Sequence, residues 1–324
     1  MGRPPVPYCS LSVLSPGFLS SVQDLGRFHC AHWGISPAGA ADPIALRLGN
    51  SLLGNPPGAP AVEMTLTGGS FRFDSDLSIA ITGSDFDPTL DGSAVPMWQT
   101  ILVRAGQVLR CGPTKSGARC YLCVSGGIEV PPLLSSSSTH VLNSLGGFDG
   151  RPLSAGDVLR CGPCELPARV NCSAVKESAL RSLYRAGPFR ITPGLQIDLF
   201  SKEARTLFSS AVYLVKEDSN RMGLRLSGPP LDRGTAKEMT TEGVSLGDIQ
   251  VPPDGQPIIL FVESPTTGGY PKIANVVLPD IHRLGQCRPR DTLSFQFVAL
   301  EEARSLLTEQ ERLLAADQSL RPTQ

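Results

Sequence analysis

The chain has 324 residues and a formal net charge of −1, from 29 lysines and arginines against 30 aspartates and glutamates. This balance gives no electrostatic basis for binding nucleic acid or an anionic membrane. Hydrophobic residues make up 41% and charged residues 18%, which excludes the disordered and fibrous classes. The length predicts about two domains, at roughly 150 residues each.

The 33 glycines and 29 prolines are spread between short apolar runs, a pattern typical of turns in a β-rich fold. No apolar run reaches the length of a membrane span, and the first residues lack the apolar core of a signal peptide, so we expect a cytoplasmic location. The nine cysteines are an odd number without compact framework spacing. In a reducing compartment we expect them to be free thiols.

Predicted helices are few. The first has Asp42 as its N-cap, Pro43 at its first position and Gly54 at its end, with an apolar stripe of Ile44, Leu48 and Leu52. The next is capped by Ser201 and ends near Phe208. Near the end of the chain, helical spacing predicts an amphipathic helix that packs on its own barrel or docks a partner, with apolar positions Leu300, Ala303, Leu306, Leu307, Leu313 and Leu314.

One segment of the sequence occurs twice. Residues 105–113, AGQVLRCGP, recur at 155–163 as AGDVLRCGP, with a weaker echo at 289–295. Each copy predicts a turn that feeds a strand. A shorter match, LSPG and ITPG, links residues 14–17 to residues 191–194.

From these repeats we predict a mainly β protein with two lobes. The N-terminal lobe covers residues 8–165, and the C-terminal lobe with the terminal helix covers 187–324. Residues 166–186 form the predicted linker, with a short helical patch from Lys176 to Leu183.

Two polar segments late in the chain carry the most chemical information: residues 241–252, TEGVSLGDIQVP, and residues 266–272, TTGGYPK. The apolar run at 258–262 predicts a buried strand between them. The glycines let backbone N–H groups approach a ligand closely or adopt positive φ, and Lys272 adds a positive charge. The pattern predicts a loop that binds a small anionic or carbonyl-bearing ligand. A tight β-turn, whose threonines satisfy backbone groups, is the alternative.

These two segments resemble the signature of the carboxyltransferase-like proteins, which are variously called the C subunit of 5-oxoprolinase, allophanate hydrolase subunit 2 and the antagonist of the sporulation kinase inhibitor. Further segments match the family in order, at residues 15–17, 22–27, 34–42, 50–55, 81–85, 121–127 and 219–223. The resemblance covers about residues 10 to 300. It implies a pair of cyclophilin-like β-barrel lobes.

The resemblance also implies a function. We expect a subunit of an ATP-dependent 5-oxoprolinase-like complex that hydrolyses 5-oxoproline, or a related cyclic amide, to the open amino acid. One alternative is a component of a biotin-dependent carboxyltransferase acting on urea or a similar amide; another is a non-enzymatic antagonist that binds a kinase inhibitor. We expect activity only with a companion subunit of similar fold and a further 5-oxoprolinase subunit. No phosphate-binding loop motif marks an ATP site, and the usual context for biotin attachment is missing, so biotin would come on a partner chain.

Polar residues within the matching segments are the candidate site. Lys272 and Arg27 are candidates for stabilising developing negative charge. Asp24 or Glu242 is the candidate acid or base. The candidates for substrate binding are Gln23, Gln250, Thr266, Thr267, Gly268, Gly269, Tyr270 and Arg221.

The sequence departs from the family at three of its usual polar positions. Glu263 and Pro265 stand where the family usually has Asp and Gln, and Ser137 stands where it usually has Arg. A missing guanidinium removes a bidentate anion contact that serine does not replace.

Cysteine and histidine patterns predict neither a redox centre nor a metal site. Cys161 and Cys164 have the spacing of a thioredoxin-type pair, but no helix pattern begins there to lower a thiol pKa. Cys120 and Cys123 lie on a predicted strand whose alternation separates their side chains. His29, Cys30 and His32 lack further ligands for zinc.

Overall fold

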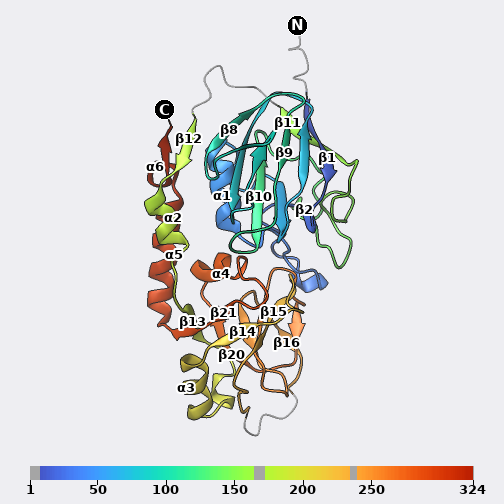
Figure 1. Ribbon diagram of the computed structural model, residues 1–324. Coiled ribbons are helices and arrows are strands. Elements are labelled where there is room, and N and C mark those ends of the chain that lie inside the picture. Colours follow the sequence, from blue (N-terminus) through green and yellow to red (C-terminus); the bar gives the residue numbers. More distant parts are fainter. Residues whose placement is uncertain (1–7, 164–171, 234–238, 324) are drawn as a thin grey trace. The chain divides into compact units, whose positions relative to one another are not determined.

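The computed structural model describes residues 8–163, 172–233 and 239–323 (Figure 1). These residues form two compact units. The first unit contains the described residues up to Arg27, those between Ala38 and Ser182, and those from Leu313 onward. The second contains Phe28–Pro37 and the described residues between Leu183 and Arg312. The predicted domain boundaries stay predictions, and the first part of the predicted linker lies outside the described residues.

Two antiparallel sheets make up most of the described part of the first unit. One has the strand order β11–β1–β4–β9–β6–β7 and the other the order β2–β3–β10–β5–β8. A short pair, β12–β23, is separate from both. The strands are β1 Tyr8–Ser15, β2 Leu19–Gln23, β3 Ala61–Thr65, β4 Ser70–Phe73, β5 Leu77–Gly83, β6 Thr89–Leu90, β7 Ser93–Ala94, β8 Thr100–Val103, β9 Val108–Arg110, β10 Arg119–Val124, β11 Val158–Pro163, β12 Ser173–Val175 and β23 Leu320–Pro322.

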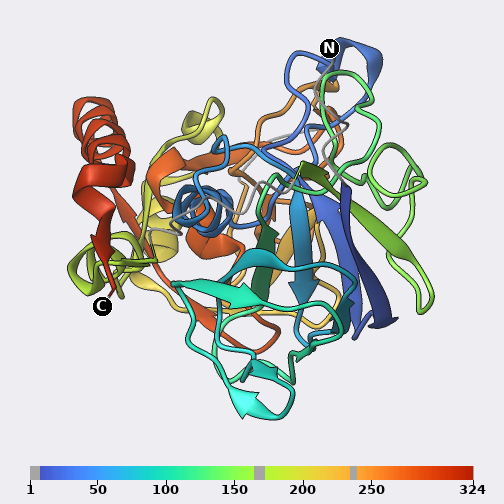
Figure 2. The ribbon, with the colours of Figure 1, turned by 90° about the horizontal axis from the view of Figure 1, so that it is seen from above.

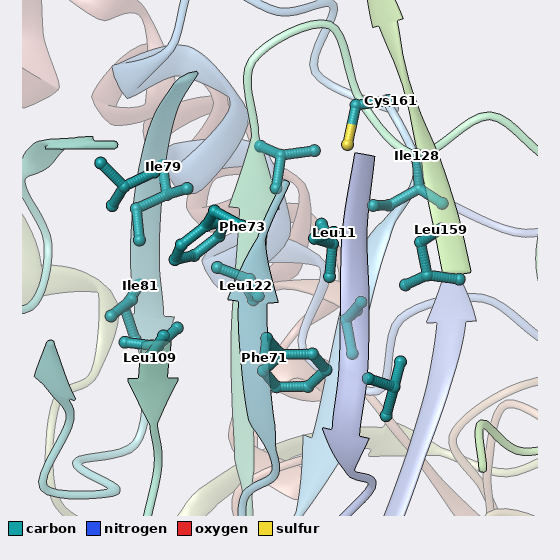
Figure 3. Packing of buried hydrophobic residues seen from close by; sticks show 14 of the residues in the cluster. Leu11, Phe71, Phe73, Ile79, Ile81, Leu109, Leu122, Ile128, Leu159 and Cys161 are labelled. Atoms are coloured by element: carbon teal, nitrogen blue, oxygen red, sulfur yellow. The ribbon is translucent and has the colours of Figure 1, made fainter. Parts of the chain in front are cut away.

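The hydrophobic core of the first unit is built from both sheets (Figure 3). Strand β4 shows how the sequence encodes it: Phe71 and Phe73 are buried while Arg72, between them, is exposed. Successive side chains of a strand point to opposite faces, so alternating apolar residues line one face. Each such buried side chain contributes about 1.5–3 kcal/mol relative to an exposed one.

Helix α1, Pro43–Leu52, packs against β5 and β10 (Figure 2). The Asp42 carboxylate accepts a hydrogen bond of 2.9 Å from the backbone N–H of Ala45, which confirms the predicted N-cap. The three residues of the predicted stripe, Ile44, Leu48 and Leu52, are all buried.

The two copies of the repeated segment form strands of the same sheet. Residues 108–110 of the first copy are β9, and residues 158–163 of the second are β11, with β1 and β4 between them. The weaker echo contains β21, Thr292–Leu293, in the second unit. The predicted strands are therefore confirmed, and the strong repeat marks two strands of one sheet.

The second unit contains an eight-stranded sheet of order β21–β14–β15–β18–β17–β20–β13–β22 within the described residues. Its two end strands, β21 and β22, are separated in sequence by Ser294, so the chain itself links the two edges into a nearly closed barrel. Its strands are β13 Phe189–Pro193, β14 Tyr213–Val215, β15 Gly223–Ser227, β17 Asp248–Gln250, β18 Ile258–Leu260, β20 Lys272–Val276, β21 Thr292–Leu293 and β22 Phe295–Phe297. The predicted mainly β fold with barrel-like lobes is confirmed.

The remaining helices are short except for α5, Leu300–Leu314, which confirms the predicted amphipathic tail. In the second unit, Gln310 of α5 donates to the Pro279 carbonyl of helix α4, Leu278–Leu284, at 2.9 Å. No helix among the described residues has the length and apolar composition needed to span a membrane. The other helices are η1 Ala31–Trp33, α2 Glu177–Leu183, η2 Ile197–Leu199, α3 Lys202–Ser210, α4 Leu278–Leu284 and α6 Ala316–Ser319.

One expectation about the cysteines is wrong. Cys9 is disulfide-bonded. A disulfide needs two thiols whose Cβ atoms approach to about 4 Å, and spacing along the chain does not reveal that approach. The free thiols among the described residues are Cys30, Cys111, Cys120, Cys123, Cys161, Cys172 and Cys287. Cys164 lies outside the described residues.

Candidate functional site

The two polar segments singled out in the sequence pair directly in the second unit. Strand β16, Glu242–Gly243, and strand β19, Thr267–Gly268, form an antiparallel ribbon in which Glu242 is opposite Gly268. The backbone N–H of Val244 extends the pairing to the Thr266 carbonyl at 3.1 Å. Residues about 25 positions apart in sequence therefore lie side by side.

Lys272 connects this ribbon to the barrel. It begins β20 and is 1% exposed, and its Nζ forms an ion pair with Glu242 Oε1. The Glu242 side chain is 38% exposed, so the pair has one buried and one solvent-accessible partner. The hydrogen bond from Lys272 is the main cause that lowers the pKa of Glu242 below its ordinary value of 4.5. The carboxylate is therefore ionised near neutral pH.

Gln196, which the sequence analysis missed, binds both members of this pair. Its Nε2 donates to Glu242 Oε1 at 2.7 Å, and its Oε1 accepts the backbone N–H of Lys272 at 3.2 Å. Gly194 makes the approach possible, because a Cβ there would lie 2.3 Å from the Lys272 carbonyl oxygen. The signal in the sequence was the ITPG segment at 191–194, which precedes Gln196 by two residues.

Gln250 supports the turn that follows β19. It is opposite Lys272 in the pairing of β17 with β20, and its Nε2 donates to the Tyr270 carbonyl at 3.4 Å. A Cβ on Gly268 would lie 2.5 Å from Gln250 Nε2. Neither Gly268 nor Gly269 has a positive φ. Glycine is therefore needed at position 268 because the Gln250 side chain approaches the backbone closely, and not because the backbone is left-handed there.

The hydroxyl-bearing residues of this turn differ in accessibility. Thr267 is exposed, Tyr270 is 42% exposed and Thr266 is half-buried. All three lie on the segment that leads through β19 to Lys272, and the hydrogen-bonding groups of Thr267 and Tyr270 are open to solvent. The structure thus brings together eight of the predicted residues around the ribbon, with Gln196 added: Glu242, Gln250, Thr266, Thr267, Gly268, Gly269, Tyr270 and Lys272.

Arg221 has a separate environment in the same unit. Its Nε lies 2.5 Å from Glu263 Oε1, and both residues are buried. The two backbones are also joined, since the Glu263 N–H donates to the Arg221 carbonyl at 2.8 Å. The family departure at Glu263 keeps a carboxylate at this position, and that carboxylate binds the guanidinium predicted to contact substrate.

The remaining candidates lie in the first unit, where Asp24 organises a run of serines. Its carboxylate accepts hydrogen bonds from the backbone N–H groups of Gly26 at 2.7 Å and Ser137 at 2.6 Å, and from the hydroxyls of Ser136 and Ser138. A buried carboxylate whose oxygens accept this many hydrogen bonds is held in a fixed position. This arrangement suits a structural role for Asp24 better than acid–base chemistry.

Gln23 and Arg27 bind the same segment as Asp24. Gln23 Nε2 donates to the Thr139 carbonyl at 3.0 Å, and the buried Arg27 guanidinium donates to the Ser138 carbonyl. The predicted site residues therefore lie in three places: around residues 136–139 in the first unit, around the ribbon in the second unit, and, for Arg221, beside Glu263 in that same second unit. Ser137, the other departure from the family, contributes its backbone N–H to the first group.

Other polar residues of the first unit stabilise the start of α1. Glu63 accepts hydrogen bonds from the Tyr121 hydroxyl at 2.6 Å and from the Ala41 N–H at 2.8 Å. The Tyr121 oxygen in turn accepts the Asp42 N–H at 2.7 Å. Burial is the main cause that raises the pKa of Tyr121 well above its ordinary value, so the phenol stays protonated as a donor.

The surroundings of Cys161 do not favour a reactive thiol. Cys161 is fully buried, and burial raises the pKa of its thiol to about 12, the opposite of a reactive thiolate. Within the described ranges, no group of three or more His, Cys, Asp and Glu side chains is arranged to hold a metal ion.

Comparison with known proteins identifies the family. Residues 33–297 match the model of the carboxyltransferase domain, subdomains A and B. The chain is 37% identical over 302 residues to the 5-oxoprolinase C subunit of Haemophilus influenzae, covering 91% of this chain and 94% of that protein. It is 36% identical over 303 residues to the 5-oxoprolinase C subunit of Escherichia coli, covering 93% and 96%.

A solved structure agrees with this assignment. The crystal structure of the K. lactis urea amidolyase matches with a TM-score of 0.84 and 30% identity, over 95% of this chain and 20% of that one. The same domain thus occurs both as a separate subunit and within a much longer chain. The chain described here belongs to the carboxyltransferase domain family, subdomains A and B, whose members include the C subunit of 5-oxoprolinase.

Proposed function

We propose that this chain is a subunit of an ATP-dependent 5-oxoprolinase-type complex that hydrolyses 5-oxoproline, or a related cyclic amide, to the open amino acid. The proposal is supported by relatives that are named as the C subunit of 5-oxoprolinase and that match over nearly their whole length. The observation that carries its chemistry is the buried Lys272, paired with a partly exposed Glu242.

A lactam carbonyl is a poor electrophile, and ATP in the assembled complex would supply its activation. The proposal assigns no ATP site to the described residues of this chain. The polar residues beside the pair would orient the substrate: the exposed Thr267, the half-buried Thr266 and Tyr270, which is 42% exposed. Once the lactam is bound in this orientation, the translational and rotational entropy needed to bring it together with the catalytic groups has already been lost, so the barrier of the chemical step is lower.

The ion pair couples proton transfer to charge stabilisation. Glu242 is an ionised carboxylate that can accept a proton from the attacking water. Once protonated, it no longer neutralises Lys272, and the ammonium is then free to stabilise the negative charge that develops on the substrate oxygen. In the resting state the same carboxylate compensates the buried lysine, whose burial without a partner would be unfavourable.

The proposal is tested in the complex reconstituted with its partner subunits, by phosphate release on addition of 5-oxoproline. We expect wild-type complex to turn over and Glu242→Gln complex to lose most of that activity. Asp87→Asn is the matched control, because the Asp87 carboxylate also forms an ion pair, with Lys115 at 2.6 Å, but on the exposed surface of the first unit. A Glu242→Gln complex as active as wild type would refute the assigned role.

A biotin-dependent carboxyltransferase component, acting on urea or a similar amide, is the second candidate. The matching family is described as a carboxyltransferase domain, and the K. lactis urea amidolyase structure matches with a TM-score of 0.84. This candidate requires biotin on a partner chain. Turnover that depends on bicarbonate and on a biotinylated chain would favour it. Tight binding to a partner without turnover of either substrate would instead favour the non-enzymatic antagonist.

A further inference from the structure

Gln196 makes two hydrogen bonds that fix the orientation of its amide. The carbonyl oxygen accepts the backbone N–H of Lys272, and the NH₂ group donates to Glu242 Oε1. A flipped amide would set its carbonyl against the carboxylate and its NH₂ group against another N–H donor. Both contacts would then be repulsive, so the backbone of Lys272 dictates that Gln196 offers a donor to Glu242.

Both hydrogen bonds to the Glu242 carboxylate fall on the same oxygen. Oε1 accepts from Lys272 Nζ and from Gln196 Nε2, while no hydrogen bond from the described residues occupies Oε2. The side chain is 38% exposed. The carboxylate is therefore held by one oxygen, and the other remains available to an incoming water or substrate proton.

We infer that Gln196 is a positioning residue that holds Oε1 of Glu242 against Lys272 and leaves Oε2 to accept the proton. This inference rests on the proposed function and adds a residue to it. Without Gln196 the carboxylate could rotate about its terminal bond, and either of its two oxygens could then face Lys272. The donor also favours the ionised form of Glu242, as the lowered pKa of that carboxyl reflects.

The test compares Gln196→Ala with wild type by NMR titration of the Glu242 side-chain carboxyl in the full chain. Loss of one donor should raise the Glu242 midpoint by about 0.5 pH unit, the scale of a modest hydrogen bond. In the reconstituted complex, the acid limb of kcat/KM should move upward by the same amount. An unchanged Glu242 midpoint in a folded variant would overturn the inference, whatever happens to turnover.

Two further variants sharpen this test. Gln196→Glu is nearly isosteric and keeps an acceptor for the Lys272 N–H, but it replaces the donor by a negative charge. It should raise the Glu242 midpoint further than Gln196→Ala does, and a smaller shift would contradict the role as a donor. Gln256→Ala is the matched control: Gln256 also bridges backbone groups of the second unit, at Gly228, without touching Glu242. It should leave the midpoint unchanged.

Failure of this inference is distinguishable from failure of the proposed function. If Gln196→Ala shifts the titration while Glu242→Gln retains turnover, Glu242 is not the base but Gln196 still positions it. If Glu242→Gln abolishes turnover while Gln196→Ala leaves the titration and the pH profile unchanged, the base is correct and the positioning role is wrong.

Discussion

The ion pair between Glu242 and Lys272 joins the β16–β19 ribbon to the barrel. Glu242 belongs to the ribbon and Lys272 to barrel strand β20, and the pairing of strands within each sheet does not connect the two. The lysine is almost fully buried, whereas the glutamate retains contact with solvent. Removing one partner therefore has a different consequence from removing the other. This asymmetry leads to the first prediction.

Glu242→Ala should destabilise the chain by about 2 kcal/mol, because it leaves a buried ammonium without its carboxylate. Lys272→Met should change the free energy of unfolding by less than about 1 kcal/mol, since Met fills similar space and the remaining carboxylate is hydrated. Urea denaturation of both variants measures the difference. The double variant should resemble Lys272→Met, and equal destabilisation by the two single changes would contradict the described burial.

The second prediction concerns glycines around the ribbon. Alanine at Gly194 should be the most disruptive, since its Cβ would lie 2.3 Å from a backbone oxygen that cannot move aside. Alanine at Gly268 should have a smaller effect, because the Gln250 side chain can shift away from a Cβ at 2.5 Å. Gly243→Ala is the control, with no atom within 4 Å. The melting temperature should fall most for Gly194→Ala, less for Gly268→Ala and least for Gly243→Ala. A decrease in melting temperature for Gly243→Ala as large as that for Gly194→Ala would contradict the geometry.

The third prediction concerns pH. The pKa of Glu242 is lowered in the folded chain, so its ion pair stabilises the fold above the ordinary value of 4.5 and loses that contribution as pH falls through the folded value. The stability difference between wild type and Glu242→Ala should thus be constant from pH 6 to 8 and shrink below about pH 4.5. Urea denaturation across this range measures it. A difference that grows on acidification would have the wrong sign.

The fourth prediction separates structure from chemistry at Asp24. Asp24→Asn should destabilise the chain by about 2 kcal/mol, because an amide replaces one acceptor oxygen by a donor that faces the Ser137 N–H. Turnover per folded complex should change little. Chemical denaturation and turnover at saturating substrate are measured together. A loss of turnover without a loss of stability would restore Asp24 as a candidate acid or base.

Local sequence signals predicted local structure well. The predicted N-cap is an example, because the hydrogen bond from the Ala45 N–H to Asp42 joins residues only three positions apart. For the same reason the strands of the repeated segment were predictable. The sequence did not predict that both copies lie in one sheet, because the order of strands in a sheet depends on contacts between residues far apart in sequence.

The candidate site was predictable as a set of residues but not as an arrangement. Lys272 and Glu242 were both named, yet their pairing depends on the register of β16 with β19. Gln196 is 46 residues from Glu242 in sequence, and no local pattern links them. Arg221 was expected to bind substrate, while the structure pairs it with Glu263, 42 residues away. Long-range hydrogen bonds decide these roles.

The most direct test of the account is turnover of the reconstituted complex with Lys272→Met, measured beside the melting temperature of the same variant. If Lys272 stabilises developing negative charge, turnover should fall by roughly 100-fold or more, the scale seen on loss of one oxyanion donor. The melting temperature should change little, and Lys115→Met should behave as wild type. Near-wild-type turnover of a folded Lys272→Met complex would contradict the account and leave the Lys272–Glu242 pair a structural link between ribbon and barrel.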